Sequence, residues 1–394
     1  MKRLEADWLT TPQTLAVIAA LEAARPGGVR FVGGCVRNTI MGRAVDDIDI
    51  ATQLEPAQTI TALKAAGLRT IPTGIEHGTV TAIVDHVPFE ITSLRRDVET
   101  DGRRAVVAFT QDWTEDAQRR DFRMNALYAA PDGEMFDPVG GGYDDAMIGR
   151  VIFIGDADQR LREDYLRILR FFRFNAWYGA EIDQDGLAAC TRQATGLPQI
   201  ARERIWKELK KMLAAPEPTL AMQAMASSGV LAKIMPGAEV TEQFGDLVAR
   251  ELAAGLEPDP MRRLMALMER DLRIAANVSE ALRLSNAEAD RLGAWASPRL
   301  DDPSRQGAQR LRAMLYWSGG QTVHDRAMLS DGGLDGILPV IDGWERPSIP
   351  LDGGDAMSAG LKGEAIGEAL RRIERYWVER DFVPEREELL DLLI

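Results

Sequence analysis

The chain changes character near residue 155, and this change limits the folds open to it. Before it, short runs rich in β-branched residues alternate with turn signals, and we expect strands at 29–32, 48–50, 78–84, 87–92 and 105–109. A helical pattern at 56–66 lies between them. After it, nearly every segment has helical periodicity, most clearly 156–178, 202–214, 218–228, 260–273, 279–292 and 363–380. The sequence therefore predicts an α+β head followed by an all-α remainder.

Composition excludes several classes of protein. The 394 residues include two cysteines, Cys35 and Cys190, which is too few for a disulfide framework or a cysteine-based zinc site. Sparse cysteine is typical of a reducing compartment, so we expect a cytoplasmic protein. The N-terminus lacks the apolar region of a signal peptide, and no apolar run approaches the roughly 20 residues that span a bilayer. We therefore expect no membrane association.

Charge is distributed unevenly along the chain. A net charge of −14 argues against a broad nucleic-acid-binding surface. Residues 150–211, however, contain 12 Lys and Arg against 9 Asp and Glu. This segment predicts a localised anion site, and a solvated helix face is an equally good interpretation of the charge alone.

A double glycine between a strand and a helix suggests a phosphate site. Gly33 and Gly34 follow the strand expected at 29–32 and precede a helix expected from Cys35 to Met41. Glycine lets the backbone approach a phosphate closely, and a helix N-terminus favours an anion. Arg37, one turn into the helix, can add a charge-assisted contact.

Spaced carboxylates follow shortly after. Asp47 and Asp49 are two residues apart, so on a strand both point to one face, whereas Asp46 points to the other. A lone pair of this kind is most often a surface turn, but here it follows the glycines, which favours a Mg²⁺ site shared with substrate phosphates. Glu90, in the middle of another expected strand, is the candidate third acid. The alternative is a water-facing glutamate on an edge strand, which Pro88 favours.

Five motifs occur in order between residues 32 and 209: VGGCVRN with VDDIDIAT, FEITSLRRD, RRDFRMNALY, REDYLRILRFFRF and RERIWKEL. They resemble the motif series of the class II tRNA nucleotidyltransferase and bacterial poly(A) polymerase family, within the polymerase-β-like superfamily. The run from Leu351 to Met357 also resembles the tail of that family. The resemblance implies a polymerase-β-like head with a small mixed sheet at 1–155, a helical neck that recognises the base at 156–215, and an all-α, RNA-binding body and tail at 216–394.

The resemblance also implies an activity and its residues. The activity is template-independent addition of C, C and A to the 3′ end of tRNA, from CTP and ATP, with Mg²⁺ as cofactor. Asp47 and Asp49 would bind metal, and Glu90 would be the third catalytic acid. The remaining matches are nucleotide-binding or supporting residues: Gly33, Gly34, Arg37, Asn38, Arg120, Asp121, Asn125, Arg160, Glu163, Asp164, Arg167 and Arg170.

Glu163, Asp164 and Arg167 resemble the EDxxR motif with which the family selects the base, and this selection has a chemical logic. The pairing edges of C and A present an amine beside a ring-nitrogen acceptor, whereas U and G present a carbonyl beside an N–H. A carboxylate and a guanidinium therefore accept C and A and reject U and G. Asp164 and Arg167 are three apart, so one helix turn would bring them to one face. The alternative is a surface ion pair worth about 0.2–0.5 kcal/mol.

The sequence departs from the family pattern at two places. Asn38 stands where the family normally has Asp, so an acceptor oxygen is kept but the charge is lost. Arg104 and Ala105 replace a commoner His-Pro at the end of the polar stretch 97–104. We expect that stretch to be a mobile hairpin loop that helps the switch from C to A addition.

Four other functions remain open from the sequence. Within the family, the enzyme could add only A, only CC, or poly(A) on other RNAs, and the motifs do not separate these activities. From a different class, the chain could be a non-catalytic RNA-binding relative, against which the intact Asp47 and Asp49 argue. Oligomeric state has no signature in the sequence.

Overall fold

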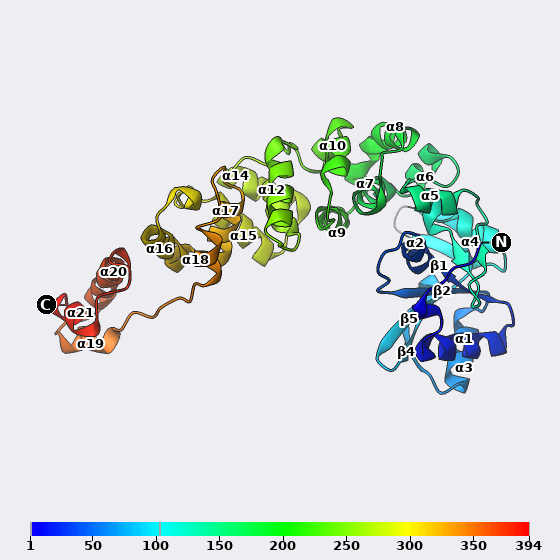
Figure 1. The fold of residues 1–394 in the computed structure, drawn as a ribbon, viewed down its shortest axis with the longest axis horizontal. Helices are drawn as coiled ribbons and strands as arrows, with labels where there is room; N and C mark the ends of the chain where they lie inside the picture. Colours follow the sequence, from blue (N-terminus) through cyan, green and yellow to red (C-terminus); the bar gives the residue numbers. More distant parts are fainter. Residues whose placement is uncertain (1, 102–103, 394) are drawn as a thin grey trace. The chain divides into compact units, whose positions relative to one another are not determined.

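The computed structural model describes residues 2–101 and 104–393 (Figure 1). The chain divides into two compact units, Met1–Pro236 and Gly237–Ile394, and each is described by itself. The functional division expected at residues 155 and 215 stays a prediction. Within the described residues, no helix is both long and apolar enough to cross a membrane.

A seven-stranded mixed sheet forms the centre of the first unit, in the order β3-β4-β5-β2-β1-β8-β9. Its strands are β1 (Val29–Val32), β2 (Ile48–Thr52), β3 (Arg69–Gly74), β4 (Thr79–Val84), β5 (Val87–Ser93), β8 (Tyr128–Ala129) and β9 (Met135–Phe136). Strands β2 and β5 are parallel, and the other pairs are antiparallel. The mixed sheet confirms the expected α+β head. Because β5 lies between β2 and β4, the edge-strand part of the alternative for Glu90 is wrong, but its side chain is exposed, as that alternative expected.

Helices cover this sheet. Helices α1 (Pro12–Ala24) and α3 (Pro56–Ala65) pack against each other and against β4, as Figure 1 shows. Their apolar faces bury Val17, Leu21 and Leu63 completely. Helix α2 (Gly34–Ile40) contacts β1, β2 and α5 (Gly142–Ile148), while α4 (Trp113–Gln118) leads into the RRDFRMNALY segment. These packed elements place the ends of β1 and β2 beside α2.

The polar stretch 97–104 is largely a strand and not a loop. Strand β6 (Arg95–Asp101) pairs with β7 (Arg104–Phe109) in a separate two-stranded sheet. Backbone pairing does not require apolar side chains, so a polar strand in a two-stranded ribbon is easily read as a loop. Gly102 and Arg103, which belong to the proposed switching loop, lie outside the described residues.

Six helices complete the first unit: α6 (Ala157–Glu163), α7 (Leu166–Tyr178), α8 (Gln184–Gln193), α9 (Arg202–Leu213), α10 (Thr219–Ser227) and α11 (Val230–Ile234). The single helix expected at 156–178 is wrong, because the chain breaks between α6 and α7. Asp164 is extended there (φ −151°, ψ 104°). Its carboxylate accepts a hydrogen bond from the Leu166 backbone N–H at 3.0 Å, which starts α7. The Tyr165 ring packs on Gly196, where an added Cβ would lie 2.2 Å from a ring carbon.

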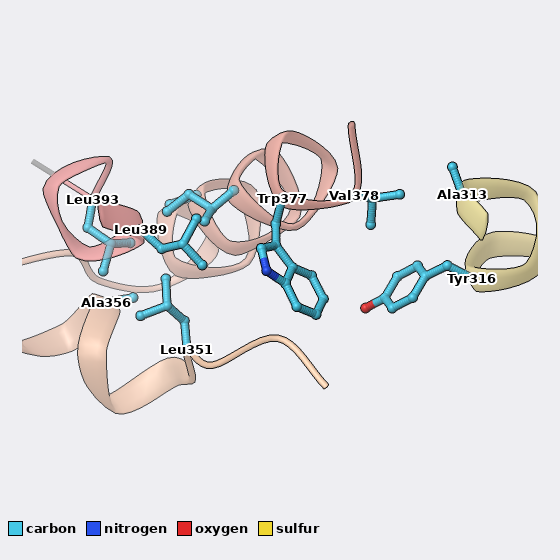
Figure 2. Close-up of a cluster of buried hydrophobic side chains, with 10 residues drawn as sticks. Ala313, Tyr316, Leu351, Ala356, Trp377, Val378, Leu389 and Leu393 are labelled. Carbon is cyan, nitrogen blue, oxygen red and sulfur yellow. The ribbon is translucent and has the colours of Figure 1, made fainter. Parts of the chain in front are cut away.

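The second unit is helical in its described residues, as expected. Its helices are α12 (Glu242–Ala253), α13 (Pro260–Met265), α14 (Leu272–Leu282), α15 (Asn286–Ala296), α16 (Ala308–Ser318), α17 (Gly320–Met328), α18 (Leu338–Asp342), α19 (Gly353–Ser358), α20 (Glu364–Glu379) and α21 (Arg386–Asp391). An apolar cluster joins the helices nearest the C-terminus (Figure 2). In it, Tyr316 of α16 meets Trp377 and Val378 of α20, and Leu389 of α21 packs nearby.

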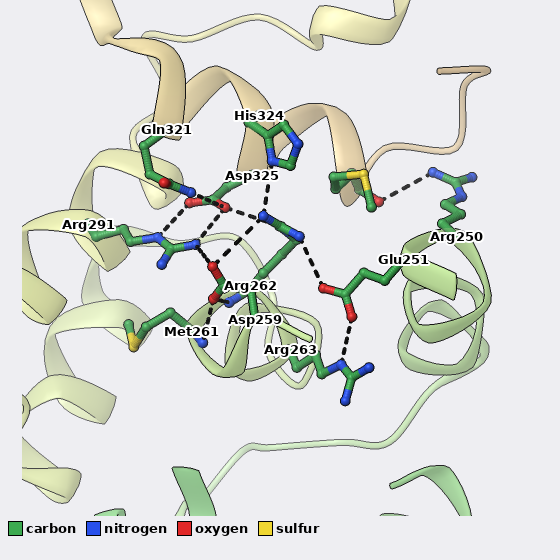
Figure 3. Close-up of polar contacts among 11 residues, drawn as sticks. Arg250, Glu251, Asp259, Met261, Arg262, Arg263, Arg291, Gln321, His324 and Asp325 are labelled. Carbon is green, nitrogen blue, oxygen red and sulfur yellow. Dashed lines mark hydrogen bonds and ion pairs between the residues drawn. The ribbon is translucent and has the colours of Figure 1, made fainter. Parts of the chain in front are cut away.

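A buried ionic network holds α12, α13, α15 and α17 together (Figure 3). Glu251 accepts from the Arg263 Nε at 2.7 Å and from the Arg262 Nη1 at 3.1 Å. Asp325, which is fully buried, accepts from Arg262 and from Arg291 of α15. His324 Nδ1 lies 3.0 Å from Arg262 Nη2, so this nitrogen accepts. Burial, and then the Arg262 charge, lower the pKa of His324.

Candidate active site

The double glycine forms the turn from β1 into α2. Gly33 has φ 73° and ψ −120°, a backbone conformation that L side chains rarely adopt. Its N–H donates to the Leu127 carbonyl at 3.2 Å, which fixes the turn beside β8. An added Cβ at Gly33 would lie 3.6 Å from Arg120 Nη1, so the turn and this guanidinium are close neighbours. The predicted phosphate site is therefore a tight turn beside an arginine.

The structure brings the predicted acids together at the parallel pair β2 and β5. Asp49 of β2 lies directly opposite Glu90 of β5 in register. Asp47 was expected on the same strand as Asp49, but it lies outside that strand, because β2 begins at Ile48. Burial raises the pKa of Asp49 to about 6, with further contributions from the charges of Glu90 and Asp47 and an opposing one from Arg120. Negative charge thus accumulates around one half-buried carboxylate.

This arrangement fits a hard divalent cation. A cation near Asp49 would offset both the burial and the neighbouring negative charges that raise its pKa, and carboxylate oxygens are the ligands Mg²⁺ prefers. Within the residues that the structure describes, no group of three or more His, Cys, Asp or Glu is placed to hold a metal by itself. Mg²⁺ is typically bound by one or two carboxylates together with substrate phosphates, so Asp47 and Asp49 are the residues whose chemistry fits this ion.

Arg120 is held in place by two residues that the sequence did not single out. Its Nη2 donates to Asp116 at 3.0 Å, its Nε donates to the Tyr128 hydroxyl at 3.3 Å, and that hydroxyl donates to Asp116 at 2.7 Å. Burial alone would raise the pKa of Asp116, but the charges of Arg120 and Arg119 outweigh it and lower the pKa. In the sequence, the i,i+4 spacing of Asp116 and Arg120 is the one pattern that could have indicated this ion pair.

Arg37 is buried and engaged by protein groups. Its Nη1 donates to Asn125 Oδ1 at 2.6 Å, and its Nη2 donates to the Tyr178 hydroxyl at 2.8 Å. The guanidinium also lies 3.9 Å from the centre of the Tyr178 ring. Burial lowers the pKa of Arg37. The side chain therefore bridges α2 and α7, and its expected contact with a phosphate stays a prediction.

Asp121 joins the RRDFRMNALY segment to α7. Its carboxylate accepts from Arg170 Nε at 2.8 Å, from Asn125 Nδ2 at 3.0 Å and from the Phe122 N–H at 2.9 Å. Although burial opposes ionisation, Arg170 and Asn125 lower the pKa of Asp121. Asp121 and Asn125, which are buried, thus form one cluster with the partly exposed Arg170, and the contact of these residues with nucleotide remains a prediction.

The EDxxR residues pair differently from the expectation. Arg167 donates to Glu163 at 2.7 Å, and Glu163 also accepts from Arg160. Asp164 instead lies 3.4 Å from Arg204, with a third of its side chain exposed. Asp164 stands in the break between α6 and α7, so the two residues do not share one helix turn. Arg160 lies in α6, and its Nη2 donates to the Arg120 carbonyl at 2.7 Å.

Two family models match the chain. Residues 29–151 match the poly(A) polymerase head domain, and residues 179–241 match the model described as a probable RNA- and SrmB-binding site of polymerase A. The mixed sheet, the paired acids and these matches define the class as a polymerase-β-like nucleotidyltransferase. Members of this class typically use a divalent metal.

Curated relatives narrow the class. The mouse (Mus musculus) protein named CCA tRNA nucleotidyltransferase 1, mitochondrial, is 34% identical over 384 residues, which cover 93% of this chain and 86% of the relative. The CCA-adding enzyme of Limosilactobacillus fermentum is 32% identical over 378 residues, which cover 91% of each. The chain therefore belongs to the CCA tRNA nucleotidyltransferase family of enzymes.

Solved structures share the fold. The Bacillus stearothermophilus CCA-adding enzyme in complex with CTP matches with a TM-score of 0.73 at 23% identity, over 98% of this chain and 97% of that one. The Thermotoga maritima CCA-adding enzyme complexed with tRNA matches with a TM-score of 0.72 at 19% identity, over 100% and 98%. At these identities the likeness concerns the fold alone.

Proposed function

We propose that the chain adds C, C and A in turn to the 3′ end of tRNA, using CTP and ATP and releasing pyrophosphate. The observation that carries this proposal is the in-register pair of Asp49 and Glu90 beside the Gly33 turn, in a chain that is 34% identical to the mouse enzyme over 384 residues. Nucleotidyl transfer needs a polarised 3′-hydroxyl and a neutralised leaving group, and no protein nucleophile.

Each group at the site has a part in this reaction. Asp47 and Asp49 would hold Mg²⁺, which would supply charge neutralisation at the triphosphate and lower the pKa of the attacking hydroxyl. Glu90 would be the third acid, facing Asp49 across the parallel pair. The Gly33 turn would let the triphosphate approach the protein backbone closely. Arg120, held by Asp116, would offer the triphosphate a fixed positive charge.

Base selection is assigned to Asp164 and Arg167. Asp164 is a third exposed, which leaves carboxylate oxygen available to accept from the exocyclic amine of C or A. Arg167 would donate to the ring nitrogen. Asp164 lies in the break between α6 and α7 and Arg167 in the first turn of α7, and we propose that both side chains contact one base edge when a nucleotide is bound. Asp164→Ala should relax the choice among the four NTPs more than it weakens RNA binding, and unchanged selectivity would contradict the assignment.

One assay tests the activity. Purified protein is incubated with Mg²⁺, labelled CTP or ATP, and tRNA that lacks CCA, lacks only the final A, or is complete. We expect CTP incorporation into the first acceptor, ATP incorporation into the second, and neither into the third. Asp49→Asn should abolish both, while Asp46→Asn, the same change at an exposed neighbour to which the proposal gives no metal-binding role, should keep them.

The other functions have distinct outcomes in the same assay. An A-adding enzyme would use only the second acceptor, and a CC-adding enzyme would stop before A. Long A tails on RNAs other than tRNA would identify a poly(A) polymerase. No incorporation into any acceptor would leave the RNA-binding function. The cytoplasmic location stays a prediction, because the relatives include bacterial enzymes and proteins named as mitochondrial.

A further inference from the structure

The Asn38 side chain joins two groups with opposite hydrogen-bonding needs. Its Oδ1 accepts from Arg37 Nη2 at 2.7 Å and from Arg37 Nε at 3.1 Å. Its Nδ2 donates to the Ala44 carbonyl at 2.9 Å. A guanidinium can only donate and a carbonyl can only accept, so the orientation of the amide is fixed. Position 38 therefore needs one acceptor and one donor, which an amide supplies and a carboxylate does not.

Ala44 lies in the segment from α2 to β2, three residues before Asp47. Residues 43–47 have no regular secondary structure, and most of them are exposed. Asn38 holds this segment twice, because its own carbonyl also accepts the Arg43 N–H at 2.8 Å. The Arg43 guanidinium in turn donates to the Trp177 carbonyl of α7. The Asn38 amide is thus an anchor close to the exposed Asp47.

This anchor is the end of a continuous chain of hydrogen bonds. Arg170 of α7 donates to Asp121, and Asn125 donates to the same carboxylate. Arg37 then donates to Asn125 at 2.6 Å and to Asn38. Asn125 and Asn38 each accept from Arg37 and donate to a further group, so the anchor is fixed from the α7 side as well as from α2.

We propose that Asn38 is a positioning residue that sets the place of Asp47 for a metal-bound triphosphate by holding the Ala44 carbonyl. The proposal rests on the proposed function, because it takes Asp47 to be a metal ligand. An aspartate at position 38 would still accept from Arg37, but it would turn an oxygen towards the Ala44 carbonyl oxygen. The anchor of the segment would then be lost while the buried Arg37 keeps its partner.

The test compares Asn38→Asp with Asn286→Asp, the same change at an exposed site in the first turn of α15. Binding of CTP is measured by calorimetry without RNA, once with Mg²⁺ and once with EDTA, and thermal melting is followed in parallel. We expect Asn38→Asp to fold, to lose about tenfold in Mg²⁺-dependent affinity, and to bind CTP within about twofold of the parent in EDTA. Asn286→Asp should match the parent throughout.

A double variant separates this role from a general structural one. In an Asp47→Asn background, Asn38→Asp should cause little further loss of Mg²⁺-dependent binding, because both changes act through the same ligand. If Asn38→Asp does not fold, Asn38→Ser, which adds no charge and is too short to reach both partners, takes its place with the same expectations. The proposal would be overturned if Asn38→Asp bound CTP in Mg²⁺ as tightly as the parent, or if its affinity for CTP fell equally in Mg²⁺ and in EDTA. Undiminished Mg²⁺-dependent binding by Asp47→Asn alone would instead overturn the metal role in the proposed function.

Discussion

Replacing Asp121 by asparagine should destabilise the first unit far more than its single-atom change suggests. Every group that faces the Asp121 carboxylate is a donor: the Arg170 guanidinium, the Asn125 amide and the Phe122 N–H. An asparagine offers one acceptor oxygen and one donor group. Whichever way its amide turns, two donors face each other on one side, and Arg170 loses its counter-charge.

The magnitude follows from burial. Breaking a buried ion pair by removing one partner costs about 3–5 kcal/mol. The Arg170 side chain is 33% exposed, so water recovers part of the lost interaction. We therefore expect the free energy of unfolding to fall by about 2–3 kcal/mol, which is a large share of the total for an ordinary domain.

Urea unfolding followed by tryptophan fluorescence measures this change, and Asp132→Asn is the matched control. Asp132 pairs with Arg3 at the surface, where the two side chains are 60% and 61% exposed. Water screens such an exposed pair, so Asp132→Asn should change the free energy of unfolding little. Equal losses in the two variants would refute the inference that the donors around Asp121 demand a carboxylate.

Three further predictions follow from other groups. Asp49→Asn should lower kcat/KM for CTP addition by about 10³-fold or more without lowering the melting temperature; a loss below tenfold would contradict a metal-binding role. His324 has a lowered pKa in the fold, so the unfolded chain takes up its proton first, and stability is lost as pH falls below about 6.5. His324→Gln should therefore flatten the decline in melting temperature between about pH 7.5 and 5.5, and an unchanged slope would argue against it. Glu251→Gln should cost about 3–5 kcal/mol in chemical denaturation, since Arg262 and Arg263 are both buried around it, and a change below about 1 kcal/mol would contradict this.

Local patterns were sufficient for several elements of the head, but not for β3, β6, β8, β9 or α1, which the sequence did not indicate. The strand expected at 29–32 is β1, the one at 87–92 is β5 with one residue added, and the helix at 56–66 is α3 with one residue removed. These elements carry β-branched runs or a helical period between clear turn signals, so neighbouring residues decide them. The same holds for the glycine turn between β1 and α2, whereas the placement of Asp47 in a strand with Asp49 was wrong.

Structural features that depend on residues distant in sequence could not be predicted from local patterns. The break between α6 and α7 interrupts a good helical period, because Asp164 bonds to the next helix and Tyr165 packs on Gly196. Arg37 looked like a free cation for a phosphate, but Tyr178 and Asn125, far along the chain, take up its donors. No local pattern reports such partners, since hydrogen bonds across 88 or 141 residues are set by the fold.

The contact between Gly196 and Tyr165 means that a residue distant in sequence helps to hold the α6–α7 break in its conformation. Any side chain at 196 would meet the Tyr165 ring, and the ring could move only by shifting the segment that carries Asp164. Position 196, which has no part in the proposed nucleotide site, can therefore change the placement of the proposed base-selecting pair. Directed evolution of nucleotide choice in this chain should accordingly yield substitutions at and around position 196 as well as in the EDxxR motif itself.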